Sequence, residues 1–214
     1  MSNSGYINYQ KADPSPALSN YVKCFWSVYN STPEEKRFTI LPDGHFDIIF
    51  TQGIQQPLTG SLAGIRTKEF ECVVPANTTK FGISFKLPAV DCLLKTGISQ
   101  YLDSETELPA GYWGITAADC TDFNTFVRKA TQVISDISIQ DMDERKQDLF
   151  NLVYSSKGAM KLEEIAATMH WKSKHLNRYF NNRFGLSLET YCNILRSRAN
   201  FDQLKKKQLF PEAD

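Results

Sequence analysis

The sequence has no long hydrophobic run. Although 42% of its 214 residues are hydrophobic, no stretch approaches the roughly 18 consecutive apolar residues that a membrane-spanning helix needs. The first residues, MSNSGYINYQK, also lack the basic segment followed by an apolar segment that marks a secretory signal. We therefore expect a cytoplasmic protein with no membrane partner.

Motifs that carry catalytic or metal-binding chemistry are also scarce. The five cysteines stand singly without a C-x-x-C pair, which is typical of reduced thiols and not of a disulfide framework. No G-x-S-x-G, P-loop or dinucleotide-binding motif occurs. His45 and Asp47 share one face of an expected strand, but the other two histidines lie far along the chain, which leaves too few ligands for a metal. We expect no metal, no cofactor and no enzyme activity.

The first hundred residues alternate with the period of β-strands. In KFGISFKL and HFDIIF, every second residue is a large apolar one. These positions are Phe81, Ile83, Phe85 and Leu87 in the first run, and Phe46, Ile48 and Phe50 in the second. The turn LPDG precedes the second run, with Asp43 placed to bond its own backbone and Gly44 to take a positive φ. Several short strands at this spacing predict a β-rich barrel or sandwich, of cupin-like type.

After residue 118 the apolar spacing becomes helical. Phe123, Phe126 and Ala130 recur at this spacing, and we expect Asp119 or Thr121 to cap the helix they form. Leu149 and Val153 mark a second helix. We predict a β-rich domain over residues 1–118, a linker helix and hinge over 119–143, with the hinge at about 136–144, and an all-helical domain over 144–214.

The segment KLEEIAATMHWKSKHLNRYFNNRFG predicts two short helices joined by a tight turn. The expected boundaries are 162–168 for the first helix, 169–171 for the turn and 173–184 for the second, with Ser173 as its cap and Gly185 ending it in a left-handed conformation. His170 stands in the turn, where many helix-turn-helix segments have glycine. The apolar face of the second helix comprises Leu176, Tyr179, Phe180 and Phe184.

The opposite face of this second helix is polar and chemically suited to DNA. Arginine pairs with guanine, asparagine with adenine, and lysine neutralises phosphates. The candidate DNA-binding residues are Lys172, Ser173, Lys174, Asn177, Arg178, Asn181 and Arg183. A polar face in contact only with solvent is the competing interpretation. Charge favours DNA: residues 1–156 hold 13 Lys and Arg against 18 Asp and Glu, whereas residues 157–214 hold 11 against 6.

These landmarks resemble the AraC/XylS family of bacterial transcription regulators. The resemblance covers LEEIAATMHWKSKHLNRYFNNRFGLSLETYCNILRSRANFDQL, with the motifs LNRYF, FGLS and LRSRA. LSNYVKCFWSV, LPDGHFDIIF, AGIRTKEF and FGISFKLPAVDCLL resemble the β-rich domain of one AraC subfamily. The resemblance implies an α+β protein in which the β-rich domain precedes an all-α helix-turn-helix domain. It also implies a ligand-responsive homodimer whose partners are promoter DNA and a small-molecule effector.

Two questions stay open at this level. Family members carry two helix-turn-helix units, whereas this sequence stops where the second should begin, so we expect either a truncated chain or one that works with a single unit. The alternative function is a ligand-binding or dimerisation module whose DNA-binding half is vestigial. The aromatic residues Trp26, Phe46, Phe50 and Phe85 would either line an effector pocket or fill the core.

Overall fold

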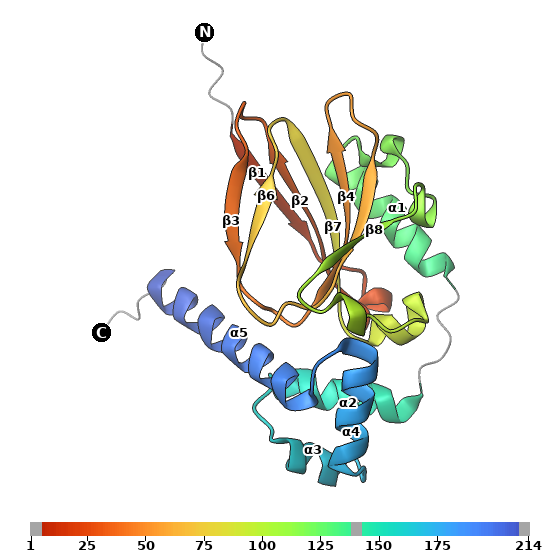
Figure 1. The fold of residues 1–214 in the computed structure, drawn as a ribbon, viewed down its shortest axis with the longest axis vertical. Coiled ribbons are helices and arrows are strands. Elements are labelled where there is room, and N and C mark those ends of the chain that lie inside the picture. Colours follow the sequence, from red (N-terminus) through yellow and green to blue (C-terminus); the bar gives the residue numbers. More distant parts are fainter. Residues whose placement is uncertain (1–5, 138–142, 210–214) are drawn as a thin grey trace.

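The computed structural model describes residues 6–137 and 143–209, and the side chains of 6–137 and 143–205. The chain is an α+β protein in which antiparallel β-sheets are followed by helices (Figure 1). Within the described ranges the last strand ends at Leu108 and every element after Ala117 is helical, which confirms the predicted change of period. Most of the predicted hinge, residues 138–142, lies outside the described residues.

The eight strands form two antiparallel sheets. The larger has the order β1-β2-β7-β4-β5-β8, and the smaller pairs β3 with β6. Their bounds are β1 Ile7–Ala12, β2 Val22–Asn30, β3 Lys36–Ile40, β4 Phe46–Gly53, β5 Thr59–Ala63, β6 Phe70–Val74, β7 Thr78–Phe85 and β8 Glu105–Leu108. Figure 1 shows α1 on one side of the six-stranded sheet and the β3–β6 pair on the other.

The helices and short helical turns complete the chain. The long helices are α1 Phe123–Asp136, α2 Glu144–Ser155, α3 Leu162–Thr168, α4 Ser173–Phe184 and α5 Leu188–Leu209. The sequence did not indicate the short turns, which are η1 Pro16–Leu18, η2 Val90–Leu94, η3 Ser99–Tyr101, η4 Tyr112–Gly114 and η5 Ala117–Cys120. None of the helices in the described ranges combines the length and apolar character needed to cross a bilayer.

The predicted alternation in β4 and β7 holds. Phe50 pairs with Phe81 and Phe46 with Phe85 across the two strands, and all four side chains are buried. The rings of Phe50 and Phe81 pack against α1, where Phe126 lies 6.0 Å from Phe50 and 5.1 Å from Phe81 between ring centroids. Burial of this apolar face stabilises the packing of the sheet on the helix, because each buried aromatic side chain removes a large apolar surface area from water.

The cap of α1 differs from the prediction. Asp122 caps the helix, and its Oδ1 accepts from the backbone N–H of Thr125 at 3.0 Å. Asp119 instead belongs to the short helix η5, where its side chain accepts from the backbone and hydroxyl of Thr116. The prediction of Asp119 or Thr121 was wrong because a separate helical turn intervenes before α1 begins.

The turn before β4 joins the sheet to α5. Gly44 has a φ of +79°, and Asp43 accepts from the backbone N–H of His45 at 3.0 Å, as the LPDG motif predicts. A Cβ on Gly44 would lie 2.8 Å from Cδ2 of Leu195 on α5. The Tyr191 hydroxyl, also on α5, donates to the Gly44 carbonyl at 3.0 Å. Glycine therefore allows the helix to approach the turn closely.

One hydrophobic core extends through both parts of the chain. It includes Phe85 and Leu87 of the β-rich part together with Phe150 and Tyr191 of the helical part. The backbone N–H of Leu87 donates to the Tyr154 hydroxyl at 3.0 Å, and Tyr154 bonds the Tyr191 hydroxyl at 3.0 Å. The β-rich and all-helical regions therefore share a packed junction.

Candidate functional site

The α3–α4 pair is joined by the tight turn that the sequence predicts. The backbone N–H groups of Met169, His170 and Trp171 donate to carbonyls of α3. His170 has a φ of +53°, a left-handed conformation that costs about 1 kcal/mol or more for a residue other than glycine. This residue lets the chain reverse direction within the turn, so the two helices cross closely beside buried Ala166.

The two ends of α4 are built differently. Lys172 occupies the cap position and Ser173 is the first helical residue, without a side-chain cap bond, so the prediction that Ser173 caps α4 was wrong. At the other end Gly185 has the predicted left-handed conformation, with a φ of +84°. A Cβ on Gly185 would lie 2.7 Å from the Ser99 carbonyl oxygen, so this end of α4 lies against η3 of the β-rich part.

The apolar face of α4 packs into the core. Leu176, Phe180 and Phe184 are fully buried, and the ring of Phe180 lies 6.2 Å from Phe150 of α2 and 5.7 Å from Tyr191 of α5. The orientation of α4 is therefore set by these two aromatic side chains of neighbouring helices as well as by its turn.

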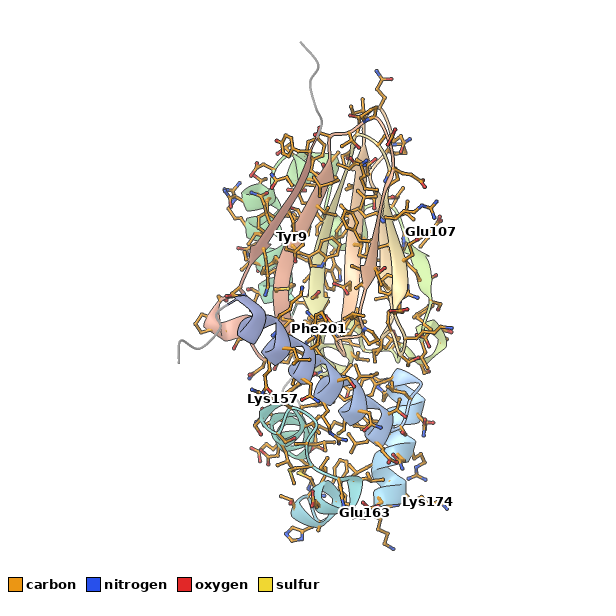
Figure 2. The ribbon with its side chains drawn as sticks, turned by 90° about the vertical axis from the view of Figure 1, so that its left-hand side faces the viewer. Tyr9, Glu107, Lys157, Glu163, Lys174 and Phe201 are labelled. Atoms are coloured by element: carbon orange, nitrogen blue, oxygen red, sulfur yellow. The ribbon has the colours of Figure 1, made fainter. Side chains whose placement is uncertain are left out.

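The polar face of α4 is open over most of its length. Lys172, Lys174, Arg178 and Asn181 are exposed, and their side chains form no hydrogen bond or ion pair within the part of the chain that the structure describes. Figure 2 shows Lys174 at the end of the molecule remote from the sheets. The fifth candidate, Ser173, is half-buried. Lys174, Arg178 and Asn181 thus follow one face of α4, and Lys172 lies just before its first residue.

Two predicted DNA-binding residues have partners inside the protein. Asn177 accepts from the backbone N–H of Leu188 at 3.2 Å, which ties α4 to the start of α5. Arg183 forms an ion pair with Asp91 of η2, and its buried Nε has no hydrogen-bond partner among the described atoms. Both side chains position α4, because they bind elements of the fold on either side of it.

Asp91 is the centre of a polar cluster that the sequence did not reveal. Its carboxylate accepts from Lys146 Nζ of α2 at 2.9 Å and from the Tyr179 hydroxyl of α4 at 2.8 Å, in addition to pairing with Arg183. Burial alone would raise the pKa of Asp91, but bonds from Lys146 and Tyr179 and the charge of Arg183 outweigh it and lower that pKa. The cluster links the β-rich part to α2 and α4.

The four aromatic residues predicted to bind a ligand do not lie together. Phe46, Phe50 and Phe85 belong to the packed core beside α1, where Phe46 stacks on Phe85 at 5.2 Å between ring centroids. Trp26 pairs with Gly82 in the strand register, so it occupies the opposite face of the sheet and remains partly exposed. The strand parity of Trp26 relative to Phe25 could have separated it from the other three.

Trp26 forms part of a hydrogen-bonded group on this opposite face. Its Nε1–H donates to Asp47 Oδ1 at 2.9 Å, and the Ser84 hydroxyl donates to the same oxygen. Burial, followed by the nearby Asp43 carboxylate, raises the pKa of Asp47 to about 6, against the lowering effect of the two hydrogen bonds and His45. The described residues contain no group of three or more His, Cys, Asp or Glu placed to hold a metal ion.

The raised pKa of Asp47 predicts a pH-dependent stability. The folded state binds the proton of the Asp47 carboxyl more tightly than the unfolded state does. The contribution of protonated Asp47 to the free energy of unfolding is therefore fully present below about pH 4 and is lost as the pH rises through about 6. From a shift of 3.8 to about 6, we expect Asp47→Asn to be more stable than the native chain at pH 7.5 by up to about 3 kcal/mol. Urea unfolding at pH 4 and pH 7.5 measures this difference. Exposed Asp13→Asn is the control, and an Asp47→Asn curve parallel to the native one would contradict the prediction.

Comparison with known families assigns the β-rich part only. Residues 10–107 match the family model described as a domain of unknown function, DUF6597, a range that runs from β1 into β8. Neither the curated proteins nor the solved structures contain a match to the chain.

Proposed function

We propose that the protein is a sequence-specific DNA-binding transcription regulator of AraC type, in which α3, its turn and α4 act as a helix-turn-helix and the DUF6597 domain senses a small molecule. The observation that carries the proposal is the row of exposed, unpaired Lys174, Arg178 and Asn181 on α4, among the described residues. Exposed Lys172 stands at the cap position beside it. A helix with a buried apolar face and a free basic and amide face is suited to enter a major groove.

The domain match supports the same class. DUF6597 domains are known in AraC-like regulators, and here the domain directly precedes the helical part. A sensor joined to a DNA-binding unit also accounts for the shared core and the Asp91 cluster at their junction. We propose double-stranded DNA and a small-molecule effector as partners, a homodimer as the assembly, and a binding role without catalysis.

The α4 residues have distinct proposed roles. Arg178 and Asn181 lie one helical turn or more beyond the start of α4 and reach base edges, whereas Lys172 and Lys174 at its start neutralise phosphates. We assign Arg183 and Asn177 to positioning of the helix, because each is bound within the protein.

Arg178→Ala tests the proposal directly. We expect it to weaken binding to a preferred site by about 1–3 kcal/mol and to relax preference at one base pair, because a bidentate guanine contact is lost. Preferred duplexes are first selected from a random-sequence library with the native protein, and affinities are then measured by fluorescence anisotropy at fixed salt. The matched control is Arg128→Ala, which removes an exposed arginine of α1.

Two results count against the proposal. One is a selection that enriches no sequence over the starting library. The other is an Arg178→Ala protein that keeps native affinity and base preference while its circular dichroism spectrum shows an intact fold.

A further inference from the structure

Trp26 lies flat on the sheet face that is turned away from α1. A Cβ on Gly82 would lie 2.0 Å from Cε2 of Trp26, so the indole covers the place where that side chain would stand. The ring reaches across β7 to β4, where its Nε1–H binds Asp47. One face of the indole therefore rests on backbone, while the side chain as a whole remains partly exposed.

The Asp47 carboxylate has an unused oxygen. Trp26 and Ser84 both donate to Oδ1, and Oδ2 has no hydrogen-bond partner within the described residues. Oδ2 is not fully buried either, so part of this oxygen remains exposed to solvent. Among the described side chains no cation forms an ion pair with Asp47. An inward-facing carboxylate without a counter-ion is costly unless something else compensates it.

Groups on more distant strands interact electrostatically with this carboxylate, among them Tyr9 of the edge strand β1, which β2 and β7 separate from β4 and whose side chain is 61% exposed. The Tyr9 phenol of β1 has its pKa raised by burial and then by the nearby Cys24 and Asp47. Burial also raises the pKa of the Cys72 thiol on β6, with a smaller contribution from Asp47. The β3–β6 pair thus lies across from Asp47, and its Phe38 and Cys72, opposite each other in register, are only partly covered.

We propose that Asp47 and Trp26 form the binding site for a small organic cation, a protonated amine with an apolar body. Asp47 Oδ2 is the counter-ion, and the indole face turned away from Gly82 is the cation–π partner, tryptophan being the strongest aromatic in this role. An anionic ligand would be repelled from the same place, because the Asp47 carboxylate has no counter-ion among the described side chains. This inference rests on the proposed sensor function and names the class of effector.

Calorimetric titration of the full chain at pH 7.5 tests the site. The probes are benzylamine and phenethylamine, both protonated at this pH, with benzyl alcohol and benzoate as neutral and anionic analogues of the same ring. We expect the amines to bind at least about tenfold more tightly than either analogue. Asp47→Asn should weaken amine binding by a further factor of about ten or more, and exposed Asp13→Asn should leave it unchanged.

A second variant and a pH series separate the site from a general effect on folding. Trp26→Leu removes the indole face but keeps the carboxylate, and we expect it also to weaken amine binding about tenfold. Amine affinity should fall between pH 7.5 and 5 as Asp47 takes up a proton. The charged or titratable groups that interact with Asp47 are Asp43, His45, Tyr9, Cys24 and Cys72, and Lys11 stands opposite Trp26 in the strand register. His45→Gln, measured over the same range, should keep the fall.

Three outcomes overturn the inference. They are amine dissociation constants all above about 1 mM, benzoate binding as tight as benzylamine binding, or equal amine affinity in native protein and a folded Asp47→Asn variant. No DNA is present in these titrations. If no amine binds but Arg178→Ala weakens DNA binding as expected, only the proposed class of ligand is wrong. If the amines bind as expected but Arg178→Ala leaves DNA binding unchanged, the DNA-binding assignment is wrong.

Discussion

Truncating Phe180 to alanine is expected to lower the free energy of unfolding by about 3–5 kcal/mol, the usual cost of removing a buried phenylalanine. The side chain is fully buried, and its ring lies within 6.2 Å of four aromatic rings, measured between centroids. No small shift of α4 refills that volume, because the Gly185 end is held against Ser99. Urea unfolding followed by circular dichroism measures the change.

The matched control is Leu204→Ala on α5. Leu204 is 61% exposed, so its truncation should change stability by no more than about 0.5 kcal/mol. Because the core is shared, we also expect Phe180→Ala to unfold strands and helices in one transition. Separate transitions of the two parts, or a loss as small as that of Leu204→Ala, would show that α4 is not anchored as described.

Replacement of Asp91 by alanine is the second large effect. Lys146 and Arg183 would lose their common counter-ion and Tyr179 its acceptor, and two half-buried cations would face each other. We expect a loss of about 2–4 kcal/mol, since removing one partner of a covered ion pair leaves an uncompensated charge. Unfolding at neutral pH and low salt measures it.

A surface pair provides the comparison for Asp91. Asp202 pairs with Arg198 one turn away on α5, with the carboxylate about half exposed, and Asp202→Ala should cost about 0.5 kcal/mol or less. Raising the salt concentration should erase the Asp202 effect and leave most of the Asp91 effect. Equal costs for the two variants would mean that the Asp91 cluster is only a surface network.

Local patterns in the sequence predicted the elements well. The alternation around Phe81 and Phe46 identified β7 and β4, and the segment KLEEIAATMHWKSKHLNRYFNNRFG identified α3 and α4, with Gly185 marking the end of α4. These signals act within a few residues, because strand and helix periodicities are properties of the local backbone. The prediction of the α1 cap failed because η5, which precedes α1, is a single short turn and gives no periodic signal in the sequence.

Local sequence patterns did not predict the contacts between segments that lie far apart in the chain. Asp91 and Tyr179 stand 88 positions apart, so nothing near Arg183 in the sequence indicates that its guanidinium is already occupied. Trp26 and Asp47 meet only because β7 lies between their strands and carries glycine at position 82. A glycine between large apolar residues in a strand was the available sign of a close approach.

The last turn of α4, unlike its first, is bound to the β-rich part, and this has a mechanical consequence. Asp91, Ser99 and Ile98 hold its last turn, where the Ile98 N–H donates to the Arg183 carbonyl at 2.8 Å. The twelve residues of α4 make a rod about 18 Å long. Tilting the rod by about 10° at the held end would carry Lys174 about 3 Å sideways, which is close to the rise of about 3.4 Å between neighbouring base pairs. A tilt too small to disturb the β-rich part could therefore shift the first turn of α4 along DNA by nearly one base pair.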